Sequence, residues 1–205
     1  MKKLVLLFFV CLQAFGQEIT EIDSVSKNNP ILFSEAYFGG GGSDSGGLLI
    51  LGLNLNYQFN KADLLTARYS GLAGGRNYYH LFFPFFVRGE SREEFAFLYG
   101  KRWVDDNFSW SVSTGVSYTY REYHQKNEGY VEKLNEDYYG VPFEFSIKWF
   151  KGEKSRFRAY YGLIPIGKKK VSFGRSVGFK LIGNISKNNY AGVAFTYGFG
   201  WHKNY

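Results

Sequence analysis

Histidine beside acidic and hydroxyl side chains can build the proton relay of hydrolases and acyltransferases, and three histidines occur in this chain. His124 is the best placed, because Glu122 and Tyr123 directly precede it and serines of neighbouring loops could approach it. His80 and His202 have no such neighbourhood. Nothing in the sequence makes a serine and a carboxylate converge on any of the three, so His124 remains a weak catalytic candidate and we predict that the protein is not an enzyme.

The motifs that bind cofactors, metals or phosphates are absent from the sequence. There is no G-x-x-x-x-G-K-[ST], H-E-x-x-H, G-x-S-x-G or C-x-x-C pattern and no EF-hand spacing. The glycine run at 39–47 lacks the lysine and the helix that would follow a phosphate-binding loop. The only cysteine is Cys11, and no two histidines have metal-ligand spacing. We therefore predict no metal site and no cofactor.

The apolar segments contain charged residues on one parity of the chain. Positioned on strands, they would all point away from the apolar face, into the interior of a barrel. In a barrel of eight to ten strands that interior is barely wider than its side chains, whereas a porin-like channel needs about 16 strands. These charges are therefore predicted to pair into a hydrogen-bonded plug. The predicted set is Glu35, Arg68, Arg102, Glu144, Lys148, Arg158 and Lys180.

A basic cluster follows the middle of the chain: Arg156, Arg158, Lys168, Lys169, Lys170 and Arg175. The simple interpretation is a solvated rim of loops, because exposed charges need no function. The alternative is contact with phosphates of lipopolysaccharide or of anionic inner-leaflet lipid. Nucleic acid is disfavoured as a partner, because aromatic rings at strand parity would face lipid and could not stack on bases.

The elements that must position these residues are β-strands, as period-two alternation indicates. It is clearest at 48–59, 108–120, 141–149 and 193–205, where large apolar residues alternate with small or polar ones. Such alternation is typical of strands with one lipid-facing side. The predicted lipid-facing residues include Val112, Val116, Phe145, Trp149, Phe195, Tyr197, Phe199 and Trp201.

Weaker strands are predicted at 32–38, 64–72, 78–87, 94–104, 156–165 and 174–185. The total of ten satisfies the rule that single-chain bacterial barrels have an even number of strands. It also places the long 121–137 connection on the periplasmic side, where turns are usually short. Pro84 lies inside 78–87 and weakens that strand. The prediction is an all-β, closed antiparallel transmembrane β-barrel of ten strands, with eight as the alternative.

The N-terminus predicts export. Lys2 and Lys3 precede an apolar run from Leu4 to Leu12, and Ala14-Phe15-Gly16 resembles a cleavage site. Residues 1–16 are therefore predicted to be a signal peptide, 17–30 a polar leader and 31–205 the barrel. Aromatic residues at 20% and 25 glycines suit a sheet with aromatic girdles.

Three segments carry a resemblance: Gly140-Val-Pro-Phe-Glu144, Leu98-Tyr-Gly100, and Ile182–Asn189 followed by an alternating last strand. They resemble small Gram-negative outer-membrane β-barrel proteins of the OmpX and PorT-like type. The resemblance implies outer-membrane location and barrel architecture. It supplies no catalytic residues, because that group shares no single activity.

The predicted function is a structural, adhesive or accessory role in the outer membrane. Expected partners are outer-membrane lipids and lipopolysaccharide, the barrel assembly machinery through the C-terminal strand, and an envelope complex of which the chain could be an accessory subunit. The alternatives are a lipid-A-modifying acyl hydrolase or transferase, a narrow pore for small solutes, and a soluble lipocalin-like barrel with its apolar parity inside.

Overall fold

In a computed structural model, the chain forms a closed antiparallel β-barrel whose wall has eight strands among the described residues. The structure describes residues 31–80, 83–127, 130–154, 158–159, 164–165 and 170–203. Side chains are described within 31–74, 89–124, 132–154 and 170–203. The wall strands are β1 (Ile31–Ser43), β2 (Gly46–Phe59), β3 (Asp63–His80), β4 (Phe83–Val104), β5 (Phe108–Asn127), β6 (Tyr130–Phe150), β9 (Phe173–Ser186) and β10 (Tyr190–Trp201).

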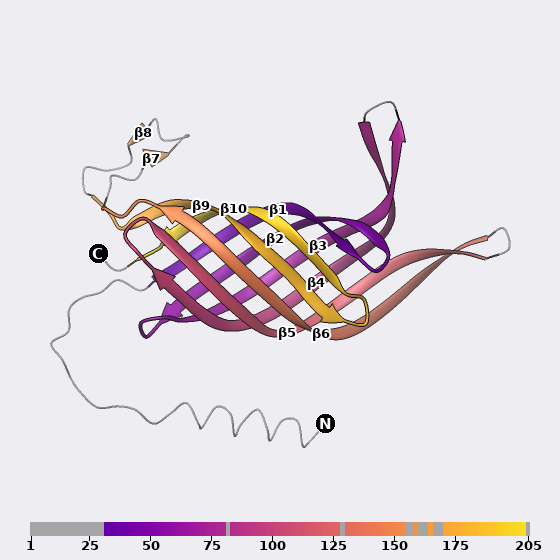
Figure 1. Ribbon diagram of the computed structural model, residues 1–205, viewed down its shortest axis with the longest axis horizontal. Coiled ribbons are helices and arrows are strands. Elements are labelled where there is room, and N and C mark those ends of the chain that lie inside the picture. Colours follow the sequence, from indigo (N-terminus) through magenta and orange to yellow (C-terminus); the bar gives the residue numbers. More distant parts are fainter. Residues whose placement is uncertain are drawn as a thin grey trace, which may run out of the picture.

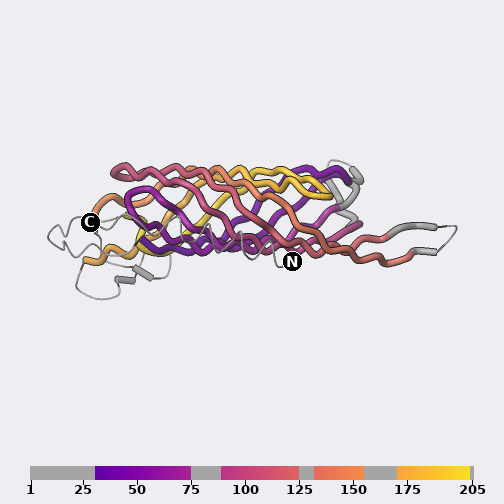
Figure 2. The backbone as a smooth tube through the Cα atoms, turned by 90° about the horizontal axis from the view of Figure 1, so that it is seen from below, coloured from indigo at the N-terminus to yellow at the C-terminus, as the bar shows by residue number. Residues whose placement is uncertain are grey.

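Around the barrel the strands follow the order β1-β10-β9-β6-β5-β4-β3-β2, and β2 pairs back onto β1. The first strand pairs with the last, from Phe33 opposite Gly200 to Ser43 opposite Tyr190, which closes the sheet. Closure removes the free sheet edges that would otherwise lack hydrogen-bond partners. Figure 1 shows the strongly tilted strands in side view, and Figure 2 shows the same wall seen from below.

The predicted count of ten strands is wrong, and the eight-strand alternative is the observed one. Segment 78–87 is not a separate strand. It belongs to the β3–β4 hairpin, whose pairing runs from Asp63 opposite Lys101 to His80 opposite Phe83, with one irregularity at Gly74/Gly75. Strand length misled the prediction, because the two long strands β3 and β4 were interpreted as three short ones, at 64–72, 78–87 and 94–104.

Segment 156–165 does not supply a wall strand either. Its described residues form β7 (Arg158–Ala159) and β8 (Ile164–Pro165), which pair only with each other. In the wall, β6 pairs directly with β9, from Gly140 opposite Ser186 to Phe150 opposite Ser176. The residues at 156–165 have the composition of a strand, but the described ones lie outside the barrel wall.

The eight-strand topology also resolves the long 121–137 connection. These residues belong to the β5–β6 hairpin, whose strands pair from Phe108 opposite Trp149 out to Asn127 opposite Tyr130. In Figure 1 this hairpin extends beyond the wall at the end opposite the C-terminus. β1 begins and β10 ends at that C-terminal end, which we call the terminal end; the opposite end is the hairpin end.

Sidedness follows the alternation in the sequence. On β5, Val112 and Val116 are exposed on the outer wall, whereas Ser111, Ser113 and Ser117 are buried inside. The other wall strands alternate in the same way, with apolar side chains outside and mostly polar ones inside, wherever side chains are described. The outer wall therefore carries an apolar belt, and the interior is mostly polar.

Two residues show how the sequence suits a tight turn and a close contact inside the barrel. Asn60 adopts a left-handed backbone (φ 49°) in the β2–β3 turn, and its side-chain amide donates a hydrogen bond to Asp63 at 2.9 Å. Inside the barrel, Gly52 leaves room for the phenol of Tyr37, which a Cβ at position 52 would strike. Among the described residues, no helix has the length and apolarity needed to cross a membrane.

Candidate functional site

The centre of the barrel holds a buried ion cluster that joins five strands. Its carboxylates are Glu35 (β1), Glu94 (β4) and Glu144 (β6), and its cations are Arg68 (β3), Lys148 (β6) and Lys180 (β9). All six side chains are buried. Three negative charges meet three positive ones, so the cluster is electrically balanced within a space from which water is largely excluded.

The pairs form a continuous chain. Lys148 pairs with Glu35, and Glu35 also lies 3.1 Å from the Lys180 ammonium. Lys180 bridges on to Glu144 at 2.8 Å. Arg68 lies 3.6 Å from Glu144 and 2.7 Å from Glu94, which extends the chain to β4. Because each link crosses between strands, the cluster ties opposite sides of the wall together.

Neutral side chains donate further hydrogen bonds to two of the three carboxylates, Glu94 and Glu144. The Asn54 amide donates to both oxygens of Glu144, at 3.2 and 3.1 Å. Asn184 donates to Glu94 at 2.6 Å, and the Tyr190 hydroxyl lies 3.0 Å from both Glu94 oxygens. Buried charges are tolerable when their remaining lone pairs are satisfied in this way.

A second layer lies nearer the terminal end and centres on Arg102. Its guanidinium donates to the Gln58 side-chain oxygen at 2.7 Å, to the Ser109 hydroxyl at 3.0 Å and to the His202 carbonyl at 2.9 Å. It also lies 4.8 Å from the ring centroid of Phe33. A guanidinium held by neutral acceptors and an aromatic face fills this end of the interior.

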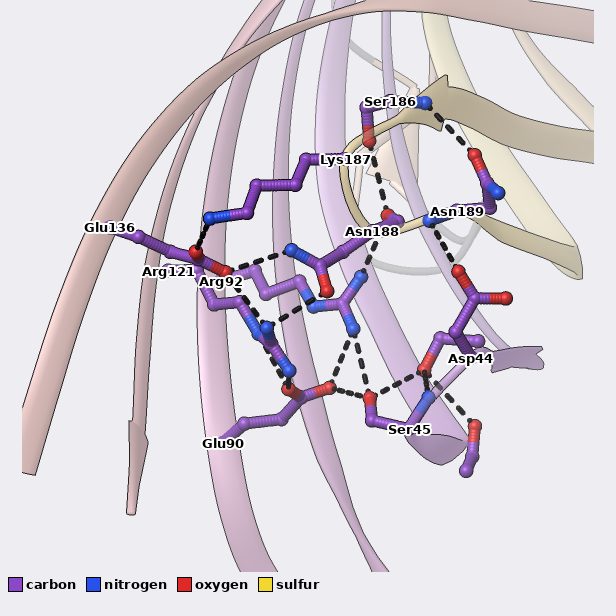
Figure 3. A network of polar contacts seen from close by, with 12 residues as sticks. Asp44, Ser45, Glu90, Arg92, Arg121, Glu136, Ser186, Lys187, Asn188 and Asn189 are labelled. Carbon is purple, nitrogen blue, oxygen red and sulfur yellow. Dashed lines mark hydrogen bonds and ion pairs between the residues drawn. The ribbon is translucent and has the colours of Figure 1, made fainter. Parts of the chain in front are cut away.

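A third layer, the rim network, spans the hairpin end (Figure 3). Glu90 pairs with Arg121 and, at 2.7 Å, with Arg92. Arg121 also reaches Glu136 at 2.8 Å, and Glu136 pairs with Lys187 at 2.5 Å. These links join β4, β5 and β6 to the β9–β10 turn.

Two further contacts draw neighbouring turns into the rim network. Arg92 donates to the Asn188 carbonyl at 3.2 Å and to the Ser45 hydroxyl at 3.0 Å. The backbone amide of Asn189 donates to Asp44 at 3.1 Å, so the β1–β2 and β9–β10 turns lie together over the interior, as Figure 3 shows. The rim network is therefore a lid made of fixed side chains and short turns.

In the outer part of the rim network, the contact between Glu136 and Lys187 stabilises the charged form of both side chains. Burial raises the pKa of Glu136, but hydrogen bonds from Lys187, Arg121 and Asn188 outweigh burial and lower it to about 2. The same pairing raises the pKa of Lys187 above its usual value, mainly through its hydrogen bond to Glu136. Both groups are charged at neutral pH, so the lid contact is an ion pair there.

The structure brings together most of the charges predicted to face the interior. Glu35, Arg68, Glu144, Lys148 and Lys180 belong to the central cluster. Arg102 lies in the adjacent layer, toward the terminal end. The side chain of Arg158 lies outside the described residues.

Glu90, Arg92 and Glu94 were missed by the sequence prediction. They share the parity of Arg102, but the predicted strand began only at residue 94, whereas β4 starts at Phe83. Extending that strand backward would have found Glu90 and Arg92. Parity would also have found Glu94, the first residue of the predicted strand.

The predicted lipid-facing residues all lie on the outer wall. Val112, Val116, Phe145, Trp149, Phe195 and Phe199 are exposed, while Tyr197 and Trp201 are half-buried. Within the Tyr138–Tyr139 pair, Tyr138 is 8% exposed and Tyr139 is 79% exposed, so the rings point to opposite sides of the wall.

The histidines do not assemble a catalytic set in the described part of the chain. His124 is exposed on β5 opposite Lys133, whose ammonium pairs with Glu122 at 2.9 Å. His202 is 1% exposed and packs against the rings of Phe33 and Phe150. The side chain of His80 lies outside the described residues.

Other predicted features fall partly outside the described residues. Within the basic cluster, side chains are described only for Lys170, which is exposed, and for Arg175, which is half-buried on the outer face of β9. In the part of the chain with described side chains, no group of three or more His, Cys, Asp or Glu residues could hold a metal ion. The predicted signal peptide and leader precede the first described residue.

No known protein family and no curated protein matches the chain. Three solved structures are similar to it in arrangement. The N-terminal β-barrel domain of Pseudomonas aeruginosa OprF is 11% identical, with a TM-score of 0.46 over 83% of this chain and 98% of that one. Ail, the attachment invasion locus protein of Yersinia pestis, is 7% identical, with a TM-score of 0.47 over 82% and 95%. Neisserial surface protein A is 8% identical, with a TM-score of 0.47 over 83% and 95%.

Proposed function

We propose that this chain is an integral outer-membrane β-barrel with a closed interior and a structural, adhesive or accessory role, and that it is not an enzyme. The observation that carries the proposal is the inverted sidedness of the wall. Ionic side chains such as Arg68, Glu94 and Lys180 are buried at the centre, while Val116, Phe97 and Ile185 are exposed on the outside. A water-soluble barrel requires the opposite arrangement.

The outer belt is too large and continuous for a surface in water. On β2 alone, Leu49, Leu51, Leu53, Leu55 and Tyr57 are exposed in succession. Soluble monomers rarely expose apolar patches above a few hundred Å². In a bilayer, the same belt is covered by acyl chains and becomes stabilising.

The aromatic residues of the outer wall also favour a bilayer as the surroundings of the barrel. Trp103 and Trp110 stack on the outer wall with ring centroids 4.0 Å apart, close to the terminal end of β4 and β5. On the other side of the barrel, Phe173 packs edge-on against Trp201 near the end of β10. Aromatic girdles of this kind mark the membrane–water interfaces of barrels.

The three polar layers support a closed interior over a pore. The Arg102 layer, the central cluster and the rim network follow one another along the barrel axis. Each is tied across the interior by hydrogen bonds or ion pairs. A solute would have to break several buried ion pairs to pass, and breaking one such pair costs about 3–5 kcal/mol.

The proposed role depends on the part of the barrel that faces the outside of the cell. With both barrel ends of the chain on the periplasmic side, as in bacterial barrels, the β5–β6 hairpin extends from the cell. Its described flanks carry exposed charges, among them Glu132, Lys133 and Asp137. We infer that this hairpin contacts lipopolysaccharide or an envelope partner, and that the alternating strand β10 is read by the barrel assembly machinery.

Heat-modifiable gel migration of the protein purified from Gram-negative membranes tests this proposal. The folded barrel should migrate faster before boiling than after it, and the protein should sediment with the outer membrane. Recovery in the soluble periplasmic fraction, with no change in migration on boiling, would reject the proposal.

A further inference from the structure

His202 is a buried titratable group that takes no part in the ion pairs of the interior. It directly follows β10 and continues the inward parity of that strand, and its side chain is 1% exposed. Its ring packs against two phenyl rings, with centroids 5.1 Å from Phe33 and 5.5 Å from Phe150. Among the described side chains, none hydrogen-bonds to its ring nitrogens. An imidazole in such a place is stable only in its neutral form, because a buried charge needs a partner.

Cations face His202 from two other strands. On β4, the Arg102 guanidinium donates to the carbonyl of His202 at 2.9 Å. On β6, the Lys148 ammonium lies 4.6 Å from the centroid of the same Phe33 ring that contacts the imidazole. Protonation of His202 would therefore add a third positive charge beside Arg102 and Lys148, and like charges repel.

The remaining neighbours of the imidazole offset these cations only in part. Glu35 on β1 favours the charged imidazole, but this carboxylate already pairs with two lysines. On β9, the backbone of Gly174 also favours the charged form. Burial, followed by the charges of Arg102 and Lys148, outweighs both and lowers the pKa of His202 from its ordinary 6.5 to about 4.

Gly200 provides a hinge two residues before His202. Its φ of 146° is one that side chains rarely adopt, and a Cβ there would lie 2.5 Å from the Cα of Phe33. Beyond the hinge, the Lys203 ammonium bonds to Asp106 at 3.2 Å, but that carboxylate is 91% exposed, and exposed pairs contribute little. The burial of His202 is therefore what draws the chain after Gly200 into the interior.

We propose that His202 is an acid-sensitive latch for the terminal end of the barrel. The neutral ring holds the chain end against Phe33, Phe150 and Arg102. The protonated ring leaves the interior, and the chain swings outward about Gly200, which opens the Arg102 layer to water. This inference goes beyond the proposed membrane function, which needs no response to pH.

The sign and size of the response follow from the two pKa values. Released His202 regains its ordinary pKa of 6.5, so the released form binds a proton more tightly than the closed form. The closed form is therefore favoured most above pH 6.5, and this advantage is lost as the pH falls toward 4. Between pH 7.5 and pH 5 the equilibrium constant for release should rise roughly thirtyfold.

Hydrogen exchange followed by mass spectrometry, on the full barrel in mild detergent, tests the latch at pH 7.5, 6 and 5. Each rate is divided by the intrinsic exchange rate at that pH. In the wild type, the peptide that contains His202 should lose protection roughly thirtyfold over this range, while a peptide from β2 stays protected. His202→Phe keeps a ring in place but cannot be protonated, so its C-terminal peptide should change less than about twofold. His124→Phe is the matched control, because it makes the same substitution at an exposed histidine, and it should respond like the wild type.

His202→Gln is a second variant that cannot be protonated, so the test does not depend on how well one replacement packs. Loss of protection as in the wild type, in both His202→Phe and His202→Gln, would overturn the latch. So would a wild-type C-terminal peptide that is equally protected at pH 7.5 and pH 5. A loss of protection in β2 that accompanies the loss at the C-terminal peptide would also overturn it, because that is acid unfolding of the whole barrel.

Discussion

At the scale of single residues, Glu35 is the carboxylate of the central cluster that pairs with Lys148. It pairs with both Lys148 and Lys180, and in the described part of the chain no other carboxylate is within ion-pair distance of Lys148. Lys180 keeps a second partner in Glu144. Loss of Glu35 therefore isolates Lys148 in the interior.

We expect Glu35→Gln to destabilise the barrel by about 3–5 kcal/mol, because it leaves a buried ammonium unpaired. Urea unfolding in phospholipid vesicles, followed by tryptophan fluorescence, measures the change. Adding Lys148→Met should recover much of the loss. Glu122→Gln is the control, because it removes the solvent-accessible Glu122–Lys133 pair and should change stability little. If Glu35→Gln were as mild as Glu122→Gln, the central cluster would not be holding the wall together.

Glu136 gives the rim network a pH dependence whose sign is defined. Its pKa in the folded protein is about 2, against an ordinary value of 4.5. A carboxyl whose pKa is lowered by folding stabilises the protein above its unfolded pKa, and that stabilisation is lost as the pH falls toward the folded pKa.

The difference in urea midpoint between wild type and Glu136→Gln should therefore be largest above pH 4.5 and shrink toward zero near pH 2. Comparing the two proteins at each pH cancels the other carboxyl groups. A difference that stays constant from pH 7 to pH 2 would show that the Lys187 and Arg121 contacts do not stabilise the ionised carboxylate.

At the scale of strands, period-two alternation predicted which side of each element faces outward. It worked because a strand's side-chain period is two, so one exposed residue such as Val116 determines the side of its neighbours Ser113 and Ser117. Strand number could not be read in the same way. It depends on which segments pair over long sequence distances, as β6 and β9 do across residues 151–172.

The lipid-facing side of β5 makes a direct prediction. Val116→Lys should destabilise the barrel in vesicles by roughly 2–4 kcal/mol if it lies near the bilayer midplane, and by less toward an interface. Val116→Leu should be close to neutral. Reversible urea unfolding measures both variants. A lysine that costs nothing, or that improves solubility without detergent, would mean that β5 faces water.

At the scale of the whole molecule, the residues of the central cluster come from strands far apart in the sequence. Glu35 and Lys180 are separated by 145 residues and still meet, because closure brings β1 beside β10 and β10 beside β9. The sequence predicted five of the six members by their parity, but it missed Glu94 and did not predict which residues pair. Partners depend on register and strand tilt, which no local pattern contains.

A closed interior predicts electrical silence. The protein reconstituted in a planar bilayer should show no steady conductance, because the Arg102 layer, the central cluster and the rim network fill the interior in turn. An empty bilayer and a porin of known conductance serve as controls. Stable, reproducible openings of the wild-type protein would favour the narrow-pore alternative.

The most direct test of the account is the sidedness of the wall in a bilayer. The only cysteine is Cys11, in the predicted signal peptide, so single-cysteine spin labels can be placed without background in the processed protein. Labels at Val116→Cys on β5 and Val193→Cys on β10, which β6 and β9 separate in the wall, should collide with membrane-dissolved oxygen and be shielded from a water-soluble nickel reagent. A label at Glu132→Cys on the hairpin should show the reverse. Nickel access at positions 116 and 193 equal to that at position 132 would contradict the membrane assignment.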